Sequence, residues 1–227
     1  EVRLPEDRKI KLQLHSNNVI HSFWAPQLFG KHDVIPGHVN EIGFTPENPG
    51  IYYGECTEFC GVAHALMRFT MVVDPQEEFD AWVASYNTER PAFDANPQTG
   101  DVSEAPRSFG ICIGCHAING TNAVAAQAGL TGNPYSVGAA PNLTLFGCRD
   151  FIAAGALANT PENLETWLHN PAGVKEGNYM ALQIKEGTLT QEQIDELVPY
   201  LLSLKPAGGC PETAREQQNL HVKQGEE

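Results

Sequence analysis

The first third of the chain alternates apolar and polar residues with the two-residue period of a β-strand. Residues 9–14 read Lys-Ile-Lys-Leu-Gln-Leu, and two later runs, around 42–44 and 69–73, alternate in the same way. Proline and glycine punctuate the stretches between these runs. We therefore expect antiparallel strands joined by long loops over the first ~75 residues.

A helix is expected directly behind these strands. The segment Asp74-Pro75-Gln76-Glu77 offers an N-cap, a proline at the first helical position and a glutamate at the third. Four apolar residues then recur at helical spacing: Phe79, Trp82, Val83 and Tyr86. Residues 87–106 are rich in proline and mixed charge and have little to bury, which indicates an interdomain linker.

The second half of the chain changes to a helical period. Thr160-Pro161-Glu162-Asn163 predicts a helix start, and Thr190-Gln191-Glu192-Gln193 is a capping box. Apolar stripes follow both segments: Leu164, Trp167 and Leu168, then Ile194, Leu197, Val198, Leu201 and Leu202. Pro199 conflicts with the last helix, because proline removes a backbone donor and costs roughly 3 kcal/mol in a helix interior.

These patterns predict two domains in a chain of 227 residues: a β domain over 1–86, a linker over 87–106, a helical domain over 107–205 and a flexible polar tail over 206–227. The sequence contains no run of about 18 apolar residues, the length that a membrane-spanning helix needs, and no signal peptide is visible. Because the chain opens directly with charged strand-like sequence, we expect a processed or truncated product whose upstream anchor is missing.

The net charge of −14 narrows the choice of partners. Nucleic acid and anionic membrane surfaces are unfavourable partners for such a chain. A basic protein partner fits the charge, although many proteins are simply acidic. Since no general base, nucleophile or phosphate-binding loop is visible, we expect the chain alone not to turn over a substrate.

Cys112-Ile113-Gly114-Cys115-His116 has the pattern of c-type haem attachment. Two thiols on one helical turn can reach both vinyl groups of a haem, and His116 then points at the iron. The alternatives are a chance match or a zinc half-site, but zinc needs a second ligand pair that this half lacks. Met180, the one methionine in this half, is the favoured sixth ligand. Its rival, His169, lies in a helix end that we expect to be exposed.

A second set of metal-ligating residues lies in one loop of the β domain, with the pattern Cys56-x3-Cys60-x3-His64-x2-Met67. Thiolates, an imidazole and a thioether are soft and borderline ligands that select copper. Two cysteines in a short loop can bridge two metals, whereas a mononuclear blue-copper site needs one. A second histidine must come from another loop, and His21 is the obvious candidate. The alternatives are zinc, which rarely takes a thioether, and a disulfide, which leaves the histidine and methionine unexplained.

Two cysteines, Cys148 and Cys210, are left over. A covalently attached haem implies a compartment outside the cytoplasm, and an oxidising compartment permits a disulfide between them. The alternative is a pair of unpaired thiols.

Residues 19–26, 30–37 and 49–73 resemble subunit II of cytochrome c oxidase, which carries the dinuclear copper centre CuA. The resemblance implies an all-β, cupredoxin-like Greek-key sandwich. It also implies that Cys56 and Cys60 bridge both coppers. One copper would be completed by His21 and Met67, and the other by His64 and the backbone carbonyl of Glu58. The Glu58 carboxylate would face a magnesium ion at the interface with subunit I.

The second half resembles class I cytochrome c, an all-α domain, in the order of its haem helix, the Ala140-Pro141-Asn142-Leu143 loop, the Met180 loop and the last helix. This resemblance implies that the Pro141 carbonyl accepts a hydrogen bond from the second ring nitrogen of His116. The chain departs from the family where Ala140 replaces the usual glycine and Ala181 the usual proline.

A cytochrome c domain behind a CuA domain is the arrangement of caa-type oxidases. It implies an electron-input subunit, in which haem c takes electrons from a soluble donor, a basic cytochrome c or another respiratory complex. The copper centre would pass them to subunit I, which reduces oxygen, with other membrane subunits alongside. We expect the extracytoplasmic face of a prokaryotic plasma membrane, with anchoring by N-terminal helices that this sequence lacks or by partner subunits.

Three other functions use similar modules. A nitric oxide reductase can take electrons through CuA, and a nitrous oxide reductase does so too, but its large catalytic domain is absent here. A copper-delivery protein needs no redox relay, so the fused haem motif argues against it.

Overall fold

The computed structural model describes residues 1–87, 105–116, 140–141, 143, 145–205 and 209–210. They form two compact units, one built mainly from residues 1–85 and the other mainly from residues between 86 and 210. Within these ranges, no helix is long and apolar enough to cross a membrane. Most of the predicted linker 87–106 and of the predicted tail 206–227 lies outside the described residues, so the domain boundaries stay predictions.

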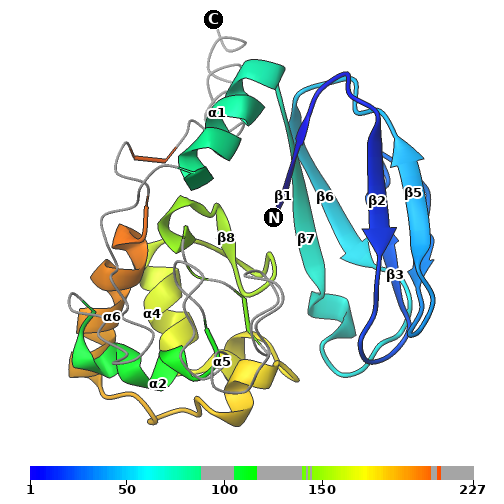
Figure 1. Cartoon of the computed structure of the whole chain (residues 1–227). Coiled ribbons are helices and arrows are strands. Elements are labelled where there is room, and N and C mark those ends of the chain that lie inside the picture. Colours follow the sequence, from blue (N-terminus) through cyan, green and yellow to red (C-terminus); the bar gives the residue numbers. More distant parts are fainter. Residues whose placement is uncertain (88–104, 117–139, 142, 144, 206–208, 211–227) are drawn as a thin grey trace, which may run out of the picture. The chain divides into compact units, whose positions relative to one another are not determined.

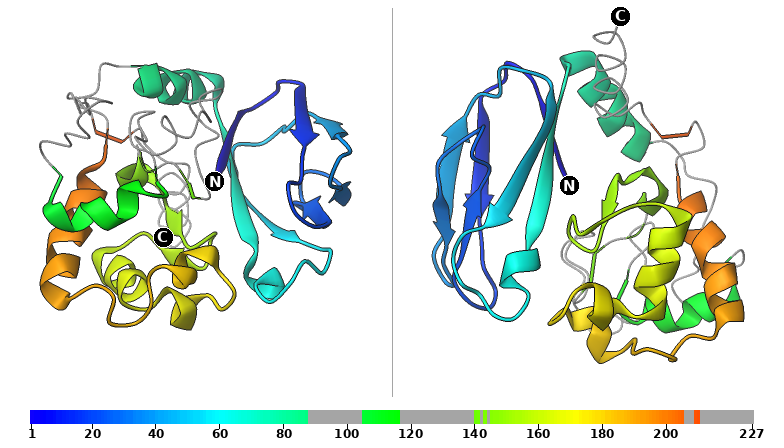
Figure 2. Two further views of the ribbon diagram at one scale, coloured as in Figure 1. Left: turned by 60° about the horizontal axis from the view of Figure 1, so that its bottom comes forward. Right: turned by 180° about the vertical axis from the view of Figure 1, so that it is seen from behind.

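The first unit is a pair of β-sheets (Figures 1 and 2). The smaller sheet pairs β2 (Ile10–Leu14) with β5 (Asn40–Phe44) in antiparallel fashion. The larger sheet has, in spatial order, β1 (Val2–Pro5), β7 (Arg68–Asp74), β6 (Gly50–Cys56), β3 (His21–Trp24) and β4 (His32–Val34). The three strands predicted from alternation are confirmed as β2, β5 and β7.

One edge of the larger sheet departs from the expected antiparallel pattern. Strand β1 runs parallel to β7, with Val2 opposite Met71 and Pro5 opposite Asp74. A buried ion pair joins the same two strands: Arg3 donates to both carboxylate oxygens of Asp74, at 2.7 and 2.8 Å. Because a buried charge is costly without a partner, this bidentate pairing favours the parallel alignment that brings the two residues together.

The same ion pair overturns the predicted helix cap. Asp74 was expected as the N-cap of the following helix, but both of its oxygens bind Arg3. Helix α1 (Gln76–Asn87) begins after Pro75 instead, whose carbonyl accepts a 3.0 Å hydrogen bond from the backbone N–H of Phe79. The Arg3 guanidinium also lies 5.6 Å from the centre of the Trp82 ring, so the first helix packs beside the edge strand.

The core of the first unit lies between its two sheets. Its most buried members are Leu4, Ala25 and Met71. Partly buried residues from both sheets and from the loop after β3 surround them: Val2, Ile10, Leu12, Phe23, Leu28, Phe29, Phe44, Tyr52 and Phe69. The Phe23 and Phe69 rings stack with centroids 4.2 Å apart. Met71 is fully buried in this core, so it is a packing residue.

Helices dominate the second unit: α2 (Gly110–Ile113), α4 (Pro161–His169), α5 (Pro171–Val174) and α6 (Gln191–Ser203). Short 3-10 turns accompany them: η2 (Arg107–Phe109), η3 (Phe146–Cys148) and η4 (Tyr179–Leu182). The short strands β8 (Phe151–Ile152) and β9 (Leu157–Ala158) pair with each other, and residues 151–157 belong to the first unit. Helices α4 and α6 pack together through buried Leu164, Leu168, Ile194, Leu197 and Leu201.

Both predicted helix starts of this half are confirmed. Thr160 caps α4 by accepting from the backbone N–H of Asn163. Thr190 and Gln193 form the reciprocal capping box of α6, at 3.3 and 2.9 Å. Helix α6 continues through Pro199, which lies on its exposed side. The carbonyl of Asp195, which loses its intrahelical donor there, belongs to an exposed residue, and water can satisfy it.

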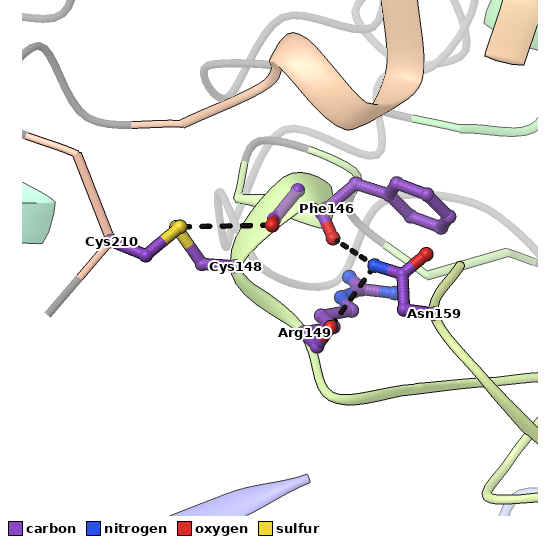
Figure 3. The surroundings of a disulfide bond; sticks show 6 residues. Phe146, Cys148, Arg149, Asn159 and Cys210 are labelled. Carbon is purple, nitrogen blue, oxygen red and sulfur yellow. Dashed lines mark hydrogen bonds between the residues drawn. A yellow bond between two sulfur atoms is a disulfide. The ribbon is translucent and has the colours of Figure 1, made fainter. Parts of the chain in front are cut away.

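A disulfide joins Cys148, at the end of η3, to Cys210, beyond α6 (Figure 3). The two Cα atoms are 5.3 Å apart, and the bond spans 62 positions of the sequence. A backbone hydrogen bond from Gly147 to the carbonyl of Leu204 ties the same two segments. A side chain at position 147 would place Cβ 2.3 Å from the Leu202 carbonyl oxygen, so glycine permits this close approach.

Substitution of Gly54 tests how tightly the larger sheet is packed. A Cβ atom at this position would lie 2.2 Å from the Phe69 ring, which the Phe23 stack holds in place. We expect Gly54→Ala to lower the free energy of unfolding by about 1–3 kcal/mol, as overpacking does. Chemical denaturation measures the change. Gly43→Ala is the control, since its Cβ would lie 4.0 Å from the nearest atom. Equal stability of the two variants would contradict the prediction.

The disulfide should stabilise the second unit by restricting its unfolded chain. The double variant Cys148→Ser/Cys210→Ser should lose about 4 kcal/mol of unfolding free energy, given the length of the closed ring. Guanidinium denaturation followed through the helical circular dichroism signal measures this loss. A thiol count on the denatured, unreduced, haem-bearing and copper-free chain provides the control: two reactive thiols, Cys56 and Cys60, are expected. Four would show that the bond is absent.

Candidate metal centres

The structure brings together all the candidate copper ligands of the first unit. Cys56 and Cys60 have their Sγ atoms 3.8 Å apart. Around this pair lie His21 Nδ1, 3.8 Å from Cys56 Sγ, His64 Nδ1, 3.6 Å from Cys60 Sγ, and Met67 Sδ, 3.8 Å from Cys60 Sγ. Two thiols, two imidazoles and a thioether therefore converge on one small volume.

The backbone carbonyl of Glu58 joins the same cluster, with its oxygen 3.2 Å from Cys56 Sγ. The Glu58 side chain is exposed. The residue thus offers a carbonyl to the cluster and keeps its carboxylate toward solvent. This arrangement is compatible with both roles that the sequence resemblance implies for Glu58.

Three strands of the larger sheet hold these donors in position. His21 is the first residue of β3, Cys56 is the last of β6, and Met67 directly precedes β7. Backbone hydrogen bonds of 3.0 Å run from Cys56 N–H to the Met67 carbonyl and from Thr57 N–H to the Ser22 carbonyl. The loop between Cys56 and Met67 is therefore closed at its base by regular sheet structure.

Within this loop, Gly61 allows the backbone to reverse. Its φ of +123° is a conformation that residues with a Cβ rarely adopt. The Gly61 carbonyl accepts a 3.0 Å hydrogen bond from the N–H of His64, and the His64 carbonyl accepts from the N–H of Met67. The turn thus orients both of the later ligands. The sequence spacing alone did not single out this glycine.

The local environment favours the protonated thiol of Cys60. Burial, reinforced by the neighbouring Cys56, raises the pKa of Cys60 above its ordinary value. Because metals bind thiolates, a metal that enters this site must displace protons from it. Of the residues that the structure describes, His21, Cys56 and Cys60 form the one cluster of three histidine, cysteine or acidic side chains with metal-binding spacing.

The haem motif lies at the start of the second unit. Helix α2 carries Cys112, and both Cys115 and His116 donate backbone hydrogen bonds to the Cys112 carbonyl. Nδ1 of His116 lies 2.8 Å from the Pro141 carbonyl oxygen, which is the hydrogen bond that the resemblance implies. A proton held there leaves Nε2 with a free lone pair for iron. Asn142, in the same loop, lies outside the described residues.

Burial controls the titration of these groups in the haem-free chain. It raises the pKa of Cys112 to about 11, with the neighbouring Cys115 thiol adding to the effect. It also lowers the pKa of His116, against the opposing effect of the Pro141 hydrogen bond. The neutral imidazole is therefore favoured, and this is the form that binds a metal.

Met180 and its rival His169 differ in their surroundings. Met180 is half-buried within η4, whereas His169 is exposed at the end of α4, as expected. Asn178 holds the methionine turn in place: its amide oxygen accepts from the N–H of Ala181 at 2.9 Å, and its amide nitrogen donates to the carbonyls of Pro171 and Lys175. Sequence reasoning missed Asn178. Its position two residues before the methionine, where asparagine commonly caps a turn, was the available signal.

Comparisons with known proteins agree with the two units. Residues 1–74 match the family described as cytochrome c oxidase subunit II, periplasmic domain, and residues 104–205 match the cytochrome c family. Cytochrome c oxidase subunit 2 of Alkalihalophilus pseudofirmus is 37% identical over 207 residues, covering 90% of this chain and 54% of that protein. The subunit 2 of Bacillus sp. strain PS3 is 38% identical over 209 residues, covering 89% and 54%.

The chain spans about half the length of these curated relatives. Among solved structures, the periplasmic domain of subunit II of cytochrome oxidase of Bradyrhizobium japonicum is 38% identical. That match covers 37% of this chain and 62% of the other, with a TM-score of 0.37. The sequence matches reach across both units.

Proposed function

We propose that this chain is the electron-input portion of a haem-copper terminal oxidase, because residues 1–74 match the periplasmic-domain family of cytochrome c oxidase subunit II and residues 104–205 match the cytochrome c family. Electrons enter from a soluble donor at haem c, pass to a dinuclear copper centre, and leave for the catalytic subunit that reduces oxygen. The chain itself carries electrons and turns over no substrate.

The convergence of the donor groups around Cys56 and Cys60 carries this proposal. Sulfur and imidazole ligands select copper, and the thioether of Met67 disfavours zinc. Two thiols 3.8 Å apart can each contact two metal ions, whereas one copper requires a single thiolate. The site therefore suits a copper pair, which both cysteines would bridge and which His21, His64, Met67 and the Glu58 carbonyl would complete.

The protein's task at this centre is to hold its ligands still. When bound, the copper pair and the haem each supply a one-electron redox couple. The sheet fixes His21, Cys56 and Met67 at strand ends, so their donor atoms keep their positions when an electron arrives. Half-burial of both cysteines limits the access of water to the sulfur atoms. A rigid and partly dry site keeps the reorganisation energy of electron transfer small.

At the second centre, Cys112 and Cys115 would form the thioether bonds to haem, and His116 and Met180 would bind its iron. The hydrogen bond to the Pro141 carbonyl orients the histidine ring and increases its basicity. Asn178 restrains the methionine turn from the other side. Methionine ligation favours a high haem potential, which suits acceptance of electrons from a respiratory donor.

The partners follow from charge and from the family. The net charge of −14 favours a basic cytochrome c as donor, with another respiratory complex as the alternative source. The acceptor is subunit I of the oxidase, with which the exposed Glu58 carboxylate would share a magnesium ion. The family match to a periplasmic domain supports an extracytoplasmic location, with anchoring through membrane helices or through partner subunits. No nucleic acid partner is proposed.

Cys60→Ser tests the copper centre and its place in the electron path. One equivalent of reduced basic cytochrome c is mixed with the loaded chain, and the haem band and the mixed-valence copper signal are followed. In the unaltered chain, haem reduction should precede loss of the copper signal. The variant should keep haem reduction and lose both the two-nucleus signal and half or more of its copper. A persistent dinuclear signal would contradict the assignment of the bridging pair.

Met180→Ala tests the axial ligand. We expect this variant to lose the weak sulfur-to-iron absorption band of oxidised haem and to show a lower haem potential, because a thioether stabilises ferrous haem. His169→Ala is the matched control and should change neither quantity, since His169 is exposed at the end of α4. Survival of both the band and the potential in Met180→Ala would reassign the ligand.

A further inference from the structure

We propose that Asn18 is a positioning residue of the copper centre. Its side-chain carbonyl holds the His21 imidazole in the tautomer that leaves Nδ1 free to bind metal. The inference rests on the proposed copper site, and it adds a residue that acts on a ligand without touching the metal.

The two ring nitrogens of His21 face different partners. Nδ1 lies 3.8 Å from Cys56 Sγ, on the side of the ligand cluster, while Nε2 lies 2.9 Å from Asn18 Oδ1. A nitrogen binds metal through its lone pair, so a neutral imidazole that binds through Nδ1 must carry its proton on Nε2. Nε2–H then needs an acceptor, and Asn18 Oδ1 is placed to be one. If the Asn18 amide were rotated by 180°, its NH2 group would donate to Nε2. The imidazole proton would then have to lie on Nδ1, the nitrogen that faces the ligand cluster.

Local hydrogen bonds prepare Asn18 for this role. Ser16 Oγ donates to the Val19 carbonyl at 2.5 Å and accepts from the N–H of Asn18 at 3.4 Å, which closes the turn before the ligand. Both ends of the turn are tied to one neighbouring segment, because Ser16 bridges to Pro36 and His21 pairs with Val34. Asn18 is therefore held by the backbone, even though its side chain is exposed.

The other candidate imidazole has a different environment. His64 Nδ1 lies 3.6 Å from Cys60 Sγ, but within the described part of the chain Nε2 of His64 has no hydrogen-bond partner. Its ring meets the ring of Phe59 edge-on, with centroids 5.7 Å apart. The fold itself thus fixes the tautomer of His21 and leaves that of His64 unassigned, which makes His64 an internal reference.

The chemical identity of residue 18 then tunes the ligand. A neutral amide oxygen accepts the Nε2 proton while polarising the ring only weakly. A carboxylate at this position would accept more strongly and make Nδ1 a better donor to copper, which stabilises the oxidised centre. Asparagine therefore favours a higher copper potential than aspartate would.

The first experiment uses the full chain without copper. Nitrogen-15 NMR of the imidazoles should show His21 predominantly as the Nε2–H tautomer. Asn18→Leu, which removes the acceptor and keeps a similar volume, should shift the population toward Nδ1–H. Asn17→Leu, at the neighbouring exposed position, should leave it unchanged. If Asn18→Leu keeps the original tautomer, or if Asn17→Leu shifts it equally, the proposal is wrong.

The second experiment loads the same chains with copper. Asn18→Leu should weaken copper binding about tenfold and alter the His21 resonances while sparing those of His64. Asn18→Asp should restore the affinity and lower the copper potential by more than Asn17→Asp, which adds the same charge one residue away. Equal potential shifts in the two aspartate variants would show a charge effect alone and would overturn the proposal.

The two experiments separate this inference from the proposed function. The tautomer is measured without metal, so it can be settled even for a chain that binds no copper. Failure of the unaltered chain to bind two coppers would remove the proposed centre. Normal binding with an unaffected Asn18→Leu variant would instead remove only the role of Asn18.

Discussion

The register of three neighbouring strands is the constraint on which the copper site depends. In that register Phe23 lies opposite Cys56, and Glu55 lies opposite both Trp24 and Arg68. This register places three candidate ligands at one end of the sheet: His21 at the start of β3, Cys56 at the end of β6 and Met67 just before β7. Because side chains alternate between faces, a slip of one residue would turn a ligand to the other face. The candidate copper ligands are thus brought together by strand pairing as much as by the loop from Cys56 to Met67, which carries most of them.

The packing beneath the sheet maintains this register. The Phe69 ring stacks on the Phe23 ring, and the centroids of the Phe23 and Phe29 rings lie 5.5 Å apart. One column of aromatic rings therefore joins β7, β3 and the loop that follows β3. Gly54 leaves room for the column on the central strand. The buried pair of Arg3 and Asp74 acts at the opposite end of β7 from the ligands. Such a pair contributes little net stability, but breaking it leaves an uncompensated buried charge, so it opposes other alignments of β1.

Local signals in the sequence predicted local structure well. The capping residues Thr160 and Thr190 marked both helix starts, because their hydrogen bonds involve residues three positions away. The alternation over 9–14 predicted β2 for the same reason. Long-range pairing was not predictable in this way. The parallel edge strand depends on an ion pair between positions 3 and 74, and Asp74 has the local pattern of a helix cap that it does not form.

The candidate sites follow the same division. Spacing alone identified the candidate ligands that share one loop: Cys56, Cys60, His64 and Met67. His21 lies in a separate segment, so spacing could not show that it reaches the same site. The sequence analysis missed the hydrogen bonds that Asn18 and Asn178 make at the two sites, because neither residue is part of a metal-binding motif. Their hydrogen bonds appear once the turns that hold them are known.

The two centres also differ in how their ligands are fixed. At the proposed copper site, His21 and Cys56 are 35 positions apart in sequence, and the pairing of β3 with β6 joins them. At the haem site, Cys112, Cys115 and His116 share one turn, and the more distant Met180 depends on its own short turn and on Asn178. Substitutions in the sheet core should therefore affect copper binding over a distance, whereas the haem site should respond mainly to changes in its own loops.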